Sequence, residues 1–442
     1  MRSNSIISHL GFTTFGESHG FALGVVIEDI KPGIDFPYQE LDLLLAQRKP
    51  NSTPYSTSRN ETDEYQIVSG IFEGKTTGMP ICILFRNNDA KSGDYDYLKD
   101  VFRPGHADFS WFNKFKIYDY RGGGRASGRE TISRVAASAF VNELIKPIKI
   151  SFQTNQIGTF NCEPIDKFFL INPANPFCWA DTKKLKELYA YLDAVKADND
   201  TVGGIIKVKI DNVPIGLGDP VFEKLNANLA KAIMSIGTIK GISFGDGFEI
   251  AKLKGSEAND HMNITGLISN HAGGITGGIS NGQSIIINLA VKPISSHGKP
   301  QQTITKSWEE VSIQITGRHD ICHIPRLIPV IEAMIKLTMA DAISYQKLIS
   351  GEQHNLNDYR EALDKLDEDL LLLLFKRKKV VEQVKQFKLQ NKLEFRNEER
   401  EQAMAEQWAT LASELGLNPD IILNLLDKVL EVCRIEHPDS TI

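Results

Sequence analysis

Residues 103–134 read RPGHADFSWFNKFKIYDYRGGGRASGRETISR and gather much of the arginine in the first part of the chain. Only two arginines follow between residues 135 and 340, although lysine is common there. The guanidinium group binds carboxylates and phosphates through two parallel hydrogen bonds, which lysine cannot do. The stretch therefore predicts a site for a small molecule with several negative charges. Its arginines are Arg103, Arg121, Arg125, Arg129 and Arg134, and His106 lies among them.

A triple glycine at residues 122–124 lies inside this stretch, and a helix is expected over residues 128–144. Glycine lets the backbone approach a ligand and turn its N–H groups towards an anion. Ile132, Val135 and Ala139 recur at helical spacing, and an anion is favoured at a helix N-terminus. The alternative is a basic loop that is tied to acidic surface elsewhere and binds no ligand.

Length and composition limit the class of protein. A chain of 442 residues with 41% hydrophobic and 24% charged residues is typical of a soluble protein with two or three domains. A net charge of −6 argues against nucleic-acid binding, and no apolar run approaches the ~20 residues of a membrane span. The five scattered cysteines form no Cys-x-x-Cys pair, so neither metal nor disulfides are expected. The cytoplasm is the expected location.

The order of elements predicts the fold class. Up to about residue 343, strands follow one another as often as they alternate with helices, which favours an α+β fold with antiparallel sheets. Strands are expected over residues 22–27, 65–72, 80–85, 204–210, 241–244 and 282–291. Helices are expected over residues 37–47, 179–195, 221–236 and 325–342.

The composition changes after about Tyr345, where glycine nearly vanishes and leucine-rich, charged helices begin. Residues 348–357 contain Ser350, Gly351 and His354 and are typical of a linker. We therefore expect one domain over residues 1–347 and an all-α domain of three helices over residues 358–442.

Further motifs place proton-transfer groups beside the arginines. Gly16-Glu-Ser-His-Gly20 holds a histidine and a hydroxyl in a turn framed by glycines. His19 and His106 could transfer protons near neutral pH, although a histidine alone is more often structural. A second glycine-rich loop at residues 270–282, with residues 292–296 and 317–320, adds further anion ligands.

These motifs resemble, in order, those of the chorismate synthase family over residues 11–342. The matching segments are GESHG at 16–20, RPGHAD at 103–108, RGGGRxSxRET at 121–131 and GRHD at 317–320. The resemblance implies a 1,4-elimination of phosphate from 5-enolpyruvylshikimate 3-phosphate, dependent on reduced FMN, to give chorismate. It also implies a helical layer between antiparallel sheets and a homotetramer. The substrate has two carboxylates and a phosphate, which suits the arginine cluster.

The resemblance also assigns roles to residues. His106 is expected to stabilise the anionic reduced flavin, His19 to protonate the departing phosphate, and Ser18 with Asp341 to form a relay near flavin N5. The substrate anions are expected on Arg48, Arg103, Arg129, Arg134 and Arg326. FMN is expected on Arg125, Ala126, Ser127, Gly278, Lys292, Pro293, Ile294, Ser295, Ser296 and Arg318. NADPH is implied only if the protein reduces its own flavin.

The tail is expected to begin with one helix over residues 358–390, about 50 Å long. A seam of alternating spacings of three and four comprises residues 363, 366, 370, 373, 377, 380, 384 and 387. Arg377 interrupts this apolar seam, at a cost unless an anion meets it. Lys388 lies on the same face, roughly 16 Å away. The alternative is a plain coiled-coil or dimerisation helix in which Arg377 reaches out to solvent.

The length of the seam predicts a dimer, because the two shorter helices that follow cannot cover it. The tail resembles the all-helical chorismate mutase family over residues 359–437, whose members rearrange chorismate to prephenate without a cofactor. The matching site residues are Arg360, Arg377, Lys388, Arg400 and Glu401, with Arg360 serving a partner's site. Asn397, Cys433 and His437 stand at site positions where the family usually has other residues.

The sequence thus predicts a bifunctional shikimate-pathway enzyme, in which the product of the synthase is the substrate of the mutase. A second hypothesis keeps the synthase and makes the tail a non-catalytic assembly or effector-binding module. A third, a flavoprotein redox enzyme, is disfavoured because no dinucleotide-binding fingerprint follows a strand.

Overall fold

The computed structural model describes residues 4–7, 9–49, 53–57, 62–87, 97–162, 165–264, 266–315, 319–350, 356–391 and 398–433. The chain divides into two compact units, residues 1–350 and residues 351–442. Within the described ranges, no helix is long and apolar enough to cross a membrane.

The first sheet is antiparallel, in the order β1-β2-β3-β7-β4. Its strands are β1 (Ser5–Ile7), β2 (Gly11–Gly16), β3 (Ala22–Ile27), β4 (Tyr65–Ser69) and β7 (Ile81–Arg86). Ile81, Ile83 and Phe85 alternate with less buried residues, so one face of β7 packs into the core. The expected strand over 65–72 is interrupted at Gly70, whose φ of +84° turns the chain. Beyond it, β5 (Ile71–Phe72) pairs with β6 (Lys75–Thr76) in a separate hairpin.

The second sheet is also antiparallel, in the order β11-β16-β10-β8-β9. Its strands are β8 (Lys149–Ile157), β9 (Phe160–Asn161), β10 (Gly204–Asp211), β11 (Ile239–Phe244) and β16 (Ile285–Val291). Along β10, Ile206, Val208 and Ile210 are fully buried while Lys207 and Lys209 lie on the other face. This alternation is the period of two that the sequence shows.

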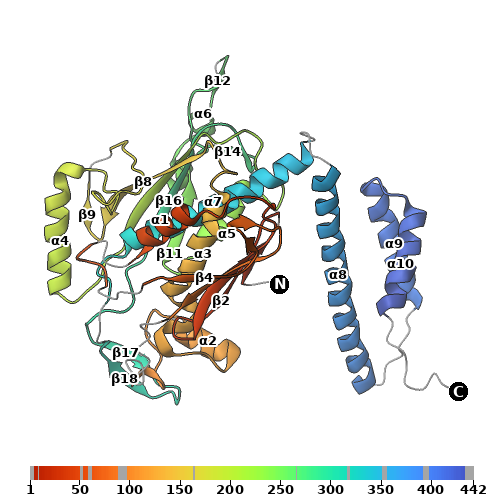
Figure 1. Cartoon of the computed structure of the whole chain (residues 1–442), viewed down its shortest axis with the longest axis horizontal. Helices are drawn as coiled ribbons and strands as arrows, with labels where there is room; N and C mark the ends of the chain where they lie inside the picture. Colours follow the sequence, from red (N-terminus) through yellow and green to blue (C-terminus); the bar gives the residue numbers. More distant parts are fainter. Residues whose placement is uncertain are drawn as a thin grey trace. The chain divides into compact units, whose positions relative to one another are not determined.

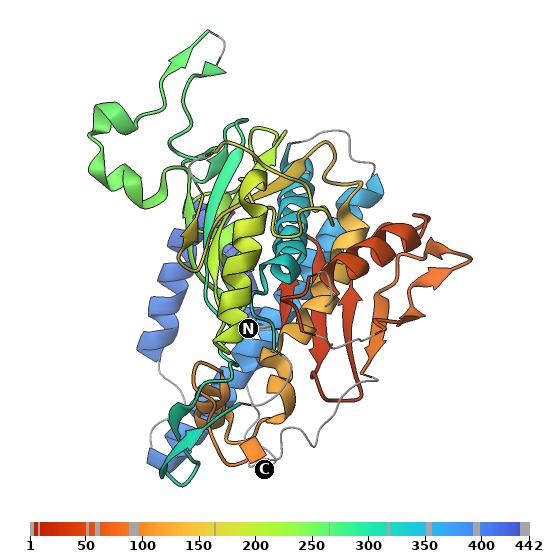
Figure 2. The same ribbon diagram turned by 90° about the vertical axis from the view of Figure 1, so that its left-hand side faces the viewer.

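A layer of helices separates the two sheets (Figures 1 and 2). Its members are α1 (Tyr38–Arg48), α3 (Thr131–Ser138), α5 (Leu225–Met234) and α7 (Ile324–Ile349). Helix α3 contacts strand β3 of the first sheet, α5 contacts β11 of the second, and α7 contacts α1, α3 and α5. The predicted α+β fold with a helical layer between antiparallel sheets is therefore confirmed.

Three expected helices are wrong in extent. The helix expected over 128–144 is α-helical only in α3, with short 3-10 turns on either side. The helix expected from Trp179 begins later, as α4 (Leu185–Ala197). The Asn175 side chain bonds both backbone groups of Trp179, which holds that fully buried residue in a loop. The helix expected from 221 begins at Leu225 in α5.

The predicted linker is too long at both ends. Leu348 and Ile349 continue α7, and Leu356 and Asn357 already belong to α8. Residues 351–355 lie outside the described part of the chain. The remaining elements of the first unit are α2 (Asp108–Phe115), α6 (Gly255–Ala258), β12 (Met262–Asn263), β13 (Gly266–Leu267), β14 (Ile275–Thr276), β15 (Ile279–Ser280), β17 (Gln301–Ile304) and β18 (Glu310–Ile313).

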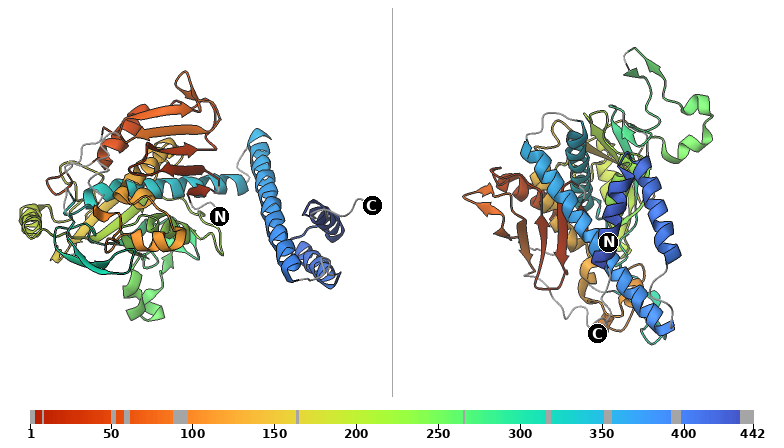
Figure 3. Two further views of the ribbon diagram at one scale, coloured as in Figure 1. Left: turned by 90° about the horizontal axis from the view of Figure 1, so that it is seen from below. Right: turned by 90° about the vertical axis from the view of Figure 1, so that its right-hand side faces the viewer.

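The described residues of the second unit form three helices, α8 (Leu356–Asn391), α9 (Glu398–Glu414) and α10 (Pro419–Cys433) (Figure 3). Helices α9 and α10 pack against each other, and α10 also contacts α8. Ala412, Leu426 and Val429 are buried in this unit. The predicted all-α domain is confirmed, and its first helix is a few residues longer than expected.

Candidate active site

The triple glycine brings the arginine-rich stretch against the Gly16–Gly20 turn. Gly122, Gly123 and Gly124 all have positive φ, which favours glycine. A methyl group on Gly122 would overlap the ring of His19 and lie 3.0 Å from Ser18 Oγ. Ser18 Oγ lies 3.2 Å from His19 Nδ1, and both side chains are buried. The turn at residues 16–20 and the turn at residues 122–124, about a hundred residues apart in sequence, thus pack against each other.

Two arginines of the stretch pair with carboxylates close by in the sequence. Arg103 binds Asp108 through two hydrogen bonds, from Nε at 2.6 Å and Nη2 at 2.8 Å, and both side chains are buried. Arg121 binds Asp119 in the same way, with both distances at 2.8 Å. Burial would raise the pKa of Asp119, but the hydrogen bonds from Arg121 hold it below its usual value. These two carboxylates lie within the stretch itself and not on acidic surface elsewhere in the chain.

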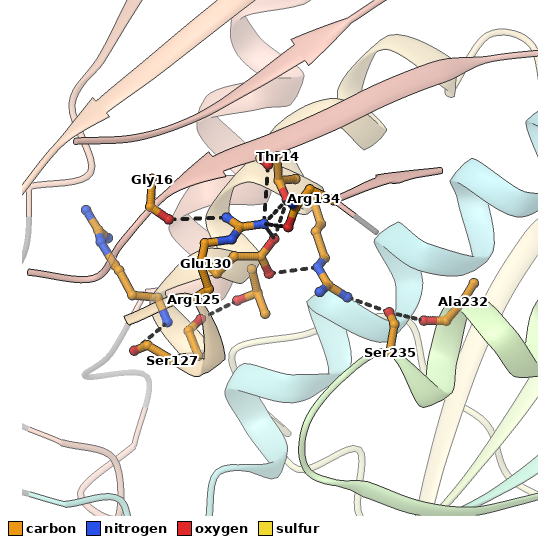
Figure 4. A network of polar contacts seen from close by, with 12 residues as sticks. Thr14, Gly16, Arg125, Ser127, Glu130, Arg134, Ala232 and Ser235 are labelled. Carbon is orange, nitrogen blue, oxygen red and sulfur yellow. Dashed lines mark hydrogen bonds and ion pairs between the residues drawn. The ribbon is translucent and has the colours of Figure 1, made fainter. Parts of the chain in front are cut away.

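Glu130 joins two further arginines of the stretch (Figure 4). Its Oε2 accepts from Arg134 Nε at 2.9 Å, and its Oε1 accepts from Thr14 Oγ1 at 2.6 Å and lies 3.6 Å from Arg125 Nη2. Arg134 Nη1 also donates to Ser235 Oγ at 2.6 Å, and Arg125 Nη2 donates to Thr14 Oγ1 at 2.7 Å. These bonds connect β2, α3 and the end of α5. Both guanidinium groups are thus turned to protein acceptors.

A second arginine group forms where α1 ends. Arg48, the last residue of α1, donates from Nη2 to Asp63 Oδ2 at 3.2 Å, and Arg129 Nη1 donates to Asp63 Oδ1. On α7, Arg326 Nη1 donates to Asp320 Oδ2 at 2.8 Å. Burial lowers the pKa of Arg48 to about 10, opposed by Asp63 and assisted by the positive charges of Arg129 and Arg326. Three arginines predicted to bind substrate therefore lie together.

This group still offers hydrogen-bond donors. The Nε atoms of Arg48 and Arg326 are buried and have no hydrogen-bond partner in the part of the chain that the structure describes. Buried donors of a charged group are costly to leave unsatisfied, and an anion would satisfy them. The group is therefore suited to a carboxylate or phosphate.

His106 lies beside the loop of residues 292–296, which is predicted to bind FMN. His106 Nε2 is 3.0 Å from Ser296 Oγ, and Lys292 Nζ donates to Gly105 O at 2.9 Å and to Ser295 Oγ at 2.6 Å. Burial, with the charges of Arg103 and Lys292, lowers the pKa of His106 to about 4. The imidazole is therefore neutral at neutral pH and interacts by hydrogen bonding rather than by positive charge.

Other predicted residues lie in different surroundings. Asp341 Oδ1 accepts from the backbone N–H groups of His9 and Leu10 at 2.7 and 3.0 Å, which anchors the turn between β1 and β2. Gly278, with φ of +95°, accepts from Leu225 N at the start of α5. Arg318 lies outside the described residues. The proposed relay of Ser18 and Asp341 stays a prediction.

Two of the remaining residues predicted to bind FMN are placed by hydrogen bonds within the chain. Ser127 Oγ accepts from Arg129 N at 3.4 Å, and the carbonyl of Ile294 accepts from Thr201 Oγ1 at 2.7 Å. Ala126 is exposed.

Sequence reasoning assigned no role to the carboxylates that hold these arginines. Asp108 and Glu130 lie inside the motifs quoted above, but Asp63 lies in none of them. It also missed Thr238, whose carbonyl accepts from Lys292 N at 2.9 Å and whose buried hydroxyl has no partner among the described residues. No local pattern marks Asp63 or Thr238, because their partners are distant in sequence.

The second unit places its predicted residues on two helices. Arg377 Nη2 lies 4.0 Å from Met404 Sδ between α8 and α9, and Arg377 Nη1 is buried with no hydrogen-bond partner in the described chain. Arg360 and Lys388 also lie on α8, and Arg400 and Glu401 lie in the first turn of α9. Asn397, the Cys433 side chain and His437 lie outside the described residues.

Comparison with known proteins gives two family matches. The model of the family described as chorismate synthase matches residues 10–344, and the model of chorismate mutase type II matches residues 359–437. A chorismate synthase of Syntrophus aciditrophicus (strain SB) is 43% identical over 353 residues, which cover 79% of this chain and 100% of the relative. A crystal structure of chorismate synthase superposes with a TM-score of 0.59 at 28% identity, covering 82% of this chain and 98% of that one.

Proposed function

The chain belongs to the chorismate synthase family and carries a C-terminal chorismate mutase type II domain. We propose that the residues of each unit carry out the reaction of its own family. The first unit is a lyase that forms chorismate, and the second is an isomerase that converts chorismate to prephenate. The joint match of both families within one chain carries this conclusion.

In the synthase reaction, the buried group of Arg48, Arg129 and Arg326 holds an anionic group of the substrate. The two buried Nε donors and the closeness of the three guanidinium groups support this assignment. His19 delivers the proton to the departing phosphate, a general-acid role that suits a buried imidazole beside a hydroxyl. Of these side chains, Arg48 and His19 are buried, and Arg129 and Arg326 are partly buried.

Reduced FMN fits the residues around His106. The buried hydroxyl of Thr238 has no partner in the described chain, and the Thr238 carbonyl accepts from the backbone N–H of Lys292, where the 292–296 loop begins. Reduced flavin, when bound, supplies an electron to the allylic system of the substrate and takes it back. His106 forms a hydrogen bond with Ser296, and both residues would help to hold the flavin. NADPH has a role only if the chain reduces its own flavin.

In the mutase reaction, cationic side chains fix a compact conformer of chorismate and stabilise charge in the transition state. The buried Nη1 of Arg377 supports an anion site between α8 and α9. Lys388, Arg400 and Glu401 complete the site in this proposal, and Arg360 serves the site of a second copy.

The assembly proposed is a homotetramer that contains dimers of the helical tail. Apart from Arg377, every member of the α8 seam is exposed in the single chain: Leu363, Leu366, Leu370, Leu373, Val380, Val384 and Phe387. An exposed apolar stripe of this length favours a second helix of the same kind. The proposed location is the cytoplasm.

The test is anaerobic incubation of the full chain with reduced FMN and 5-enolpyruvylshikimate 3-phosphate, with chorismate and prephenate followed together. Both products are expected, chorismate first. The matched control is Arg377→Ala, which should accumulate chorismate and form little prephenate. Chorismate without prephenate in the unchanged chain would favour a non-catalytic tail.

A further inference from the structure

Asp63 is a buried carboxylate shared by two arginines that come from different elements. Its Oδ2 accepts from Arg48 at the end of α1, and its Oδ1 accepts from Arg129 in the turn before α3. The Asp63 side chain is 0% exposed. Its backbone has φ of +54°, in the left-handed region that residues other than glycine rarely adopt. The chain is therefore held in an unusual conformation at the point that places this carboxylate.

Like charges meet around Asp63. The positive charges of Arg129 and Arg326 add to burial in disfavouring the charged form of Arg48. The carboxylate of Asp63 pairs with Arg48 and Arg129, and that of Asp320 pairs with Arg326. The positive charges of Arg48 and Arg129 hold the pKa of Asp63 below its usual value although burial would raise it.

Asp63 differs from the other carboxylates near the arginines. Asp108 and Asp119 each hold one arginine that is close in sequence, and Glu130 holds two that also bond hydroxyl groups. Asp63 alone among these joins α1 to the arginine-rich stretch. It leaves Arg48 Nε without a partner among the described residues, so that this atom can meet an anion.

We propose that Asp63 is a positioning residue of the synthase site, which sets the spacing of Arg48 and Arg129 for the phosphate group of the substrate. This inference rests on the proposed function of the first unit. One carboxylate oxygen fixes each guanidinium group, so the two groups stay together despite their like charges. The buried Nε of Arg48 is then placed for phosphate before the substrate arrives, and binding requires little rearrangement.

The first experiment is steady-state synthase kinetics of full-length Asp63→Asn with saturating reduced FMN. The amide keeps the size of the carboxylate but turns an NH2 group towards one arginine. KM for the phosphorylated substrate should rise about 10- to 100-fold, the effect of losing one charge-assisted hydrogen bond, while kcat changes much less. Inorganic phosphate should inhibit the variant more weakly. FMN affinity and mutase rate should not change.

The matched control is Asp35→Asn, which removes a surface carboxylate paired with Lys75 and should leave KM unchanged. The double variant Arg48→Gln, Asp63→Asn distinguishes positioning from a general structural effect. If Asp63 acts through Arg48, its substitution should raise KM much less when Arg48 is already replaced. Effects that multiply would overturn the proposal.

A variant that does not fold is recognised by loss of FMN binding, and Asp63→Glu then takes its place. Glutamate keeps the charge but moves it by one methylene, so KM should again rise with kcat nearly unchanged. Wild-type KM in the folded Asp63→Asn or Asp63→Glu variant, or tighter inhibition by phosphate, would overturn the proposal. Failure of the proposed function looks different, because the unchanged chain would then form no chorismate.

Discussion

At the scale of single residues, the candidate site depends on the close approach of two backbone turns as well as on the charge of its arginines. The three glycines at 122–124 allow one turn to lie against Ser18 and His19, and each takes a backbone conformation that favours glycine. The arginines are held by carboxylates, so their positions are set before any ligand binds. Specific substitutions should therefore change the synthase without changing the mutase.

Gly122→Ala should lower the synthase rate by about 10²-fold or more. The added methyl group overlaps the ring of His19 and must displace it from its place beside Ser18. A displacement of about 1 Å costs a catalytic group roughly this factor. The measurement is chorismate formation by the full chain. Gly128→Ala is the control, since nothing lies within 4 Å of a Cβ there, and equal rates for both variants would contradict the expectation.

His19→Ala should cut synthase turnover by roughly 10²-fold or more, the usual range for a general acid. The mutase rate of the same variant should stay at the wild-type value, because Arg377 and the rest of the tail are unchanged. Chorismate and prephenate formation are assayed separately on one preparation. Near-normal turnover would remove His19 from the proposed mechanism.

At the scale of elements, helix α8 has an apolar face that another helix would have to cover. Its seam residues recur every three or four positions from 363 to 387. Among the described residues, α10 contacts α8, and Arg377 of α8 lies near Met404 of α9. Leu366 and Leu373 remain about 60% exposed. A single chain therefore leaves the seam uncovered.

Leu373→Glu should weaken self-association through α8, because a carboxylate would be buried in the apolar seam of the proposed dimer. Sedimentation of the full chain should show a smaller assembly, and prephenate formation should fall because Arg360 no longer reaches a partner's site. Lys379→Glu, which changes a charge off the seam, is the control. An unchanged sedimentation pattern for Leu373→Glu would contradict the seam dimer.

At the scale of the whole molecule, buried ionisable groups link stability to pH. His323 is buried at the start of α7, and neither ring nitrogen has a hydrogen-bond partner in the described part of the chain. Burial lowers the pKa of His323 to about 4, whereas an unfolded histidine titrates near about 6.5. Between these values only the unfolded chain binds the proton. The contribution of His323 to stability is thus complete above pH 6.5 and is lost as pH falls towards 4.

His323→Gln should therefore flatten the dependence of unfolding free energy on pH between about 6.5 and 4.5. One histidine contributes a slope of about 1.4 kcal/mol per pH unit in this window. The measurement is urea unfolding followed by tryptophan fluorescence at several pH values. His261→Gln, which replaces an exposed histidine, should leave the slope as it is. Equal slopes for wild type and His323→Gln would contradict the assignment.

The sequence by itself determined the class of fold, the change of composition near residue 345 and the cluster of arginines for which anion binding is proposed. These features depend on local period and residue type, as in the alternation along β10 and the seam of α8. Element boundaries were less certain, because side chains such as Asn175 can take the backbone bonds that a helix would use. The local sequence pattern does not show when a side chain competes with the helix for these backbone hydrogen bonds.

Only the tertiary structure decided which groups meet. Arg129 and Asp63 are 66 residues apart, His106 and Ser296 are 190 apart, and Asp341 reaches residues more than 330 positions earlier. No periodicity encodes such pairs, because they arise when two sheets and a helical layer close around one core. The role of Asp63 was therefore invisible in the sequence, since a lone aspartate before a strand resembles any surface residue. Burial against two guanidinium groups is what makes Asp63 part of the site.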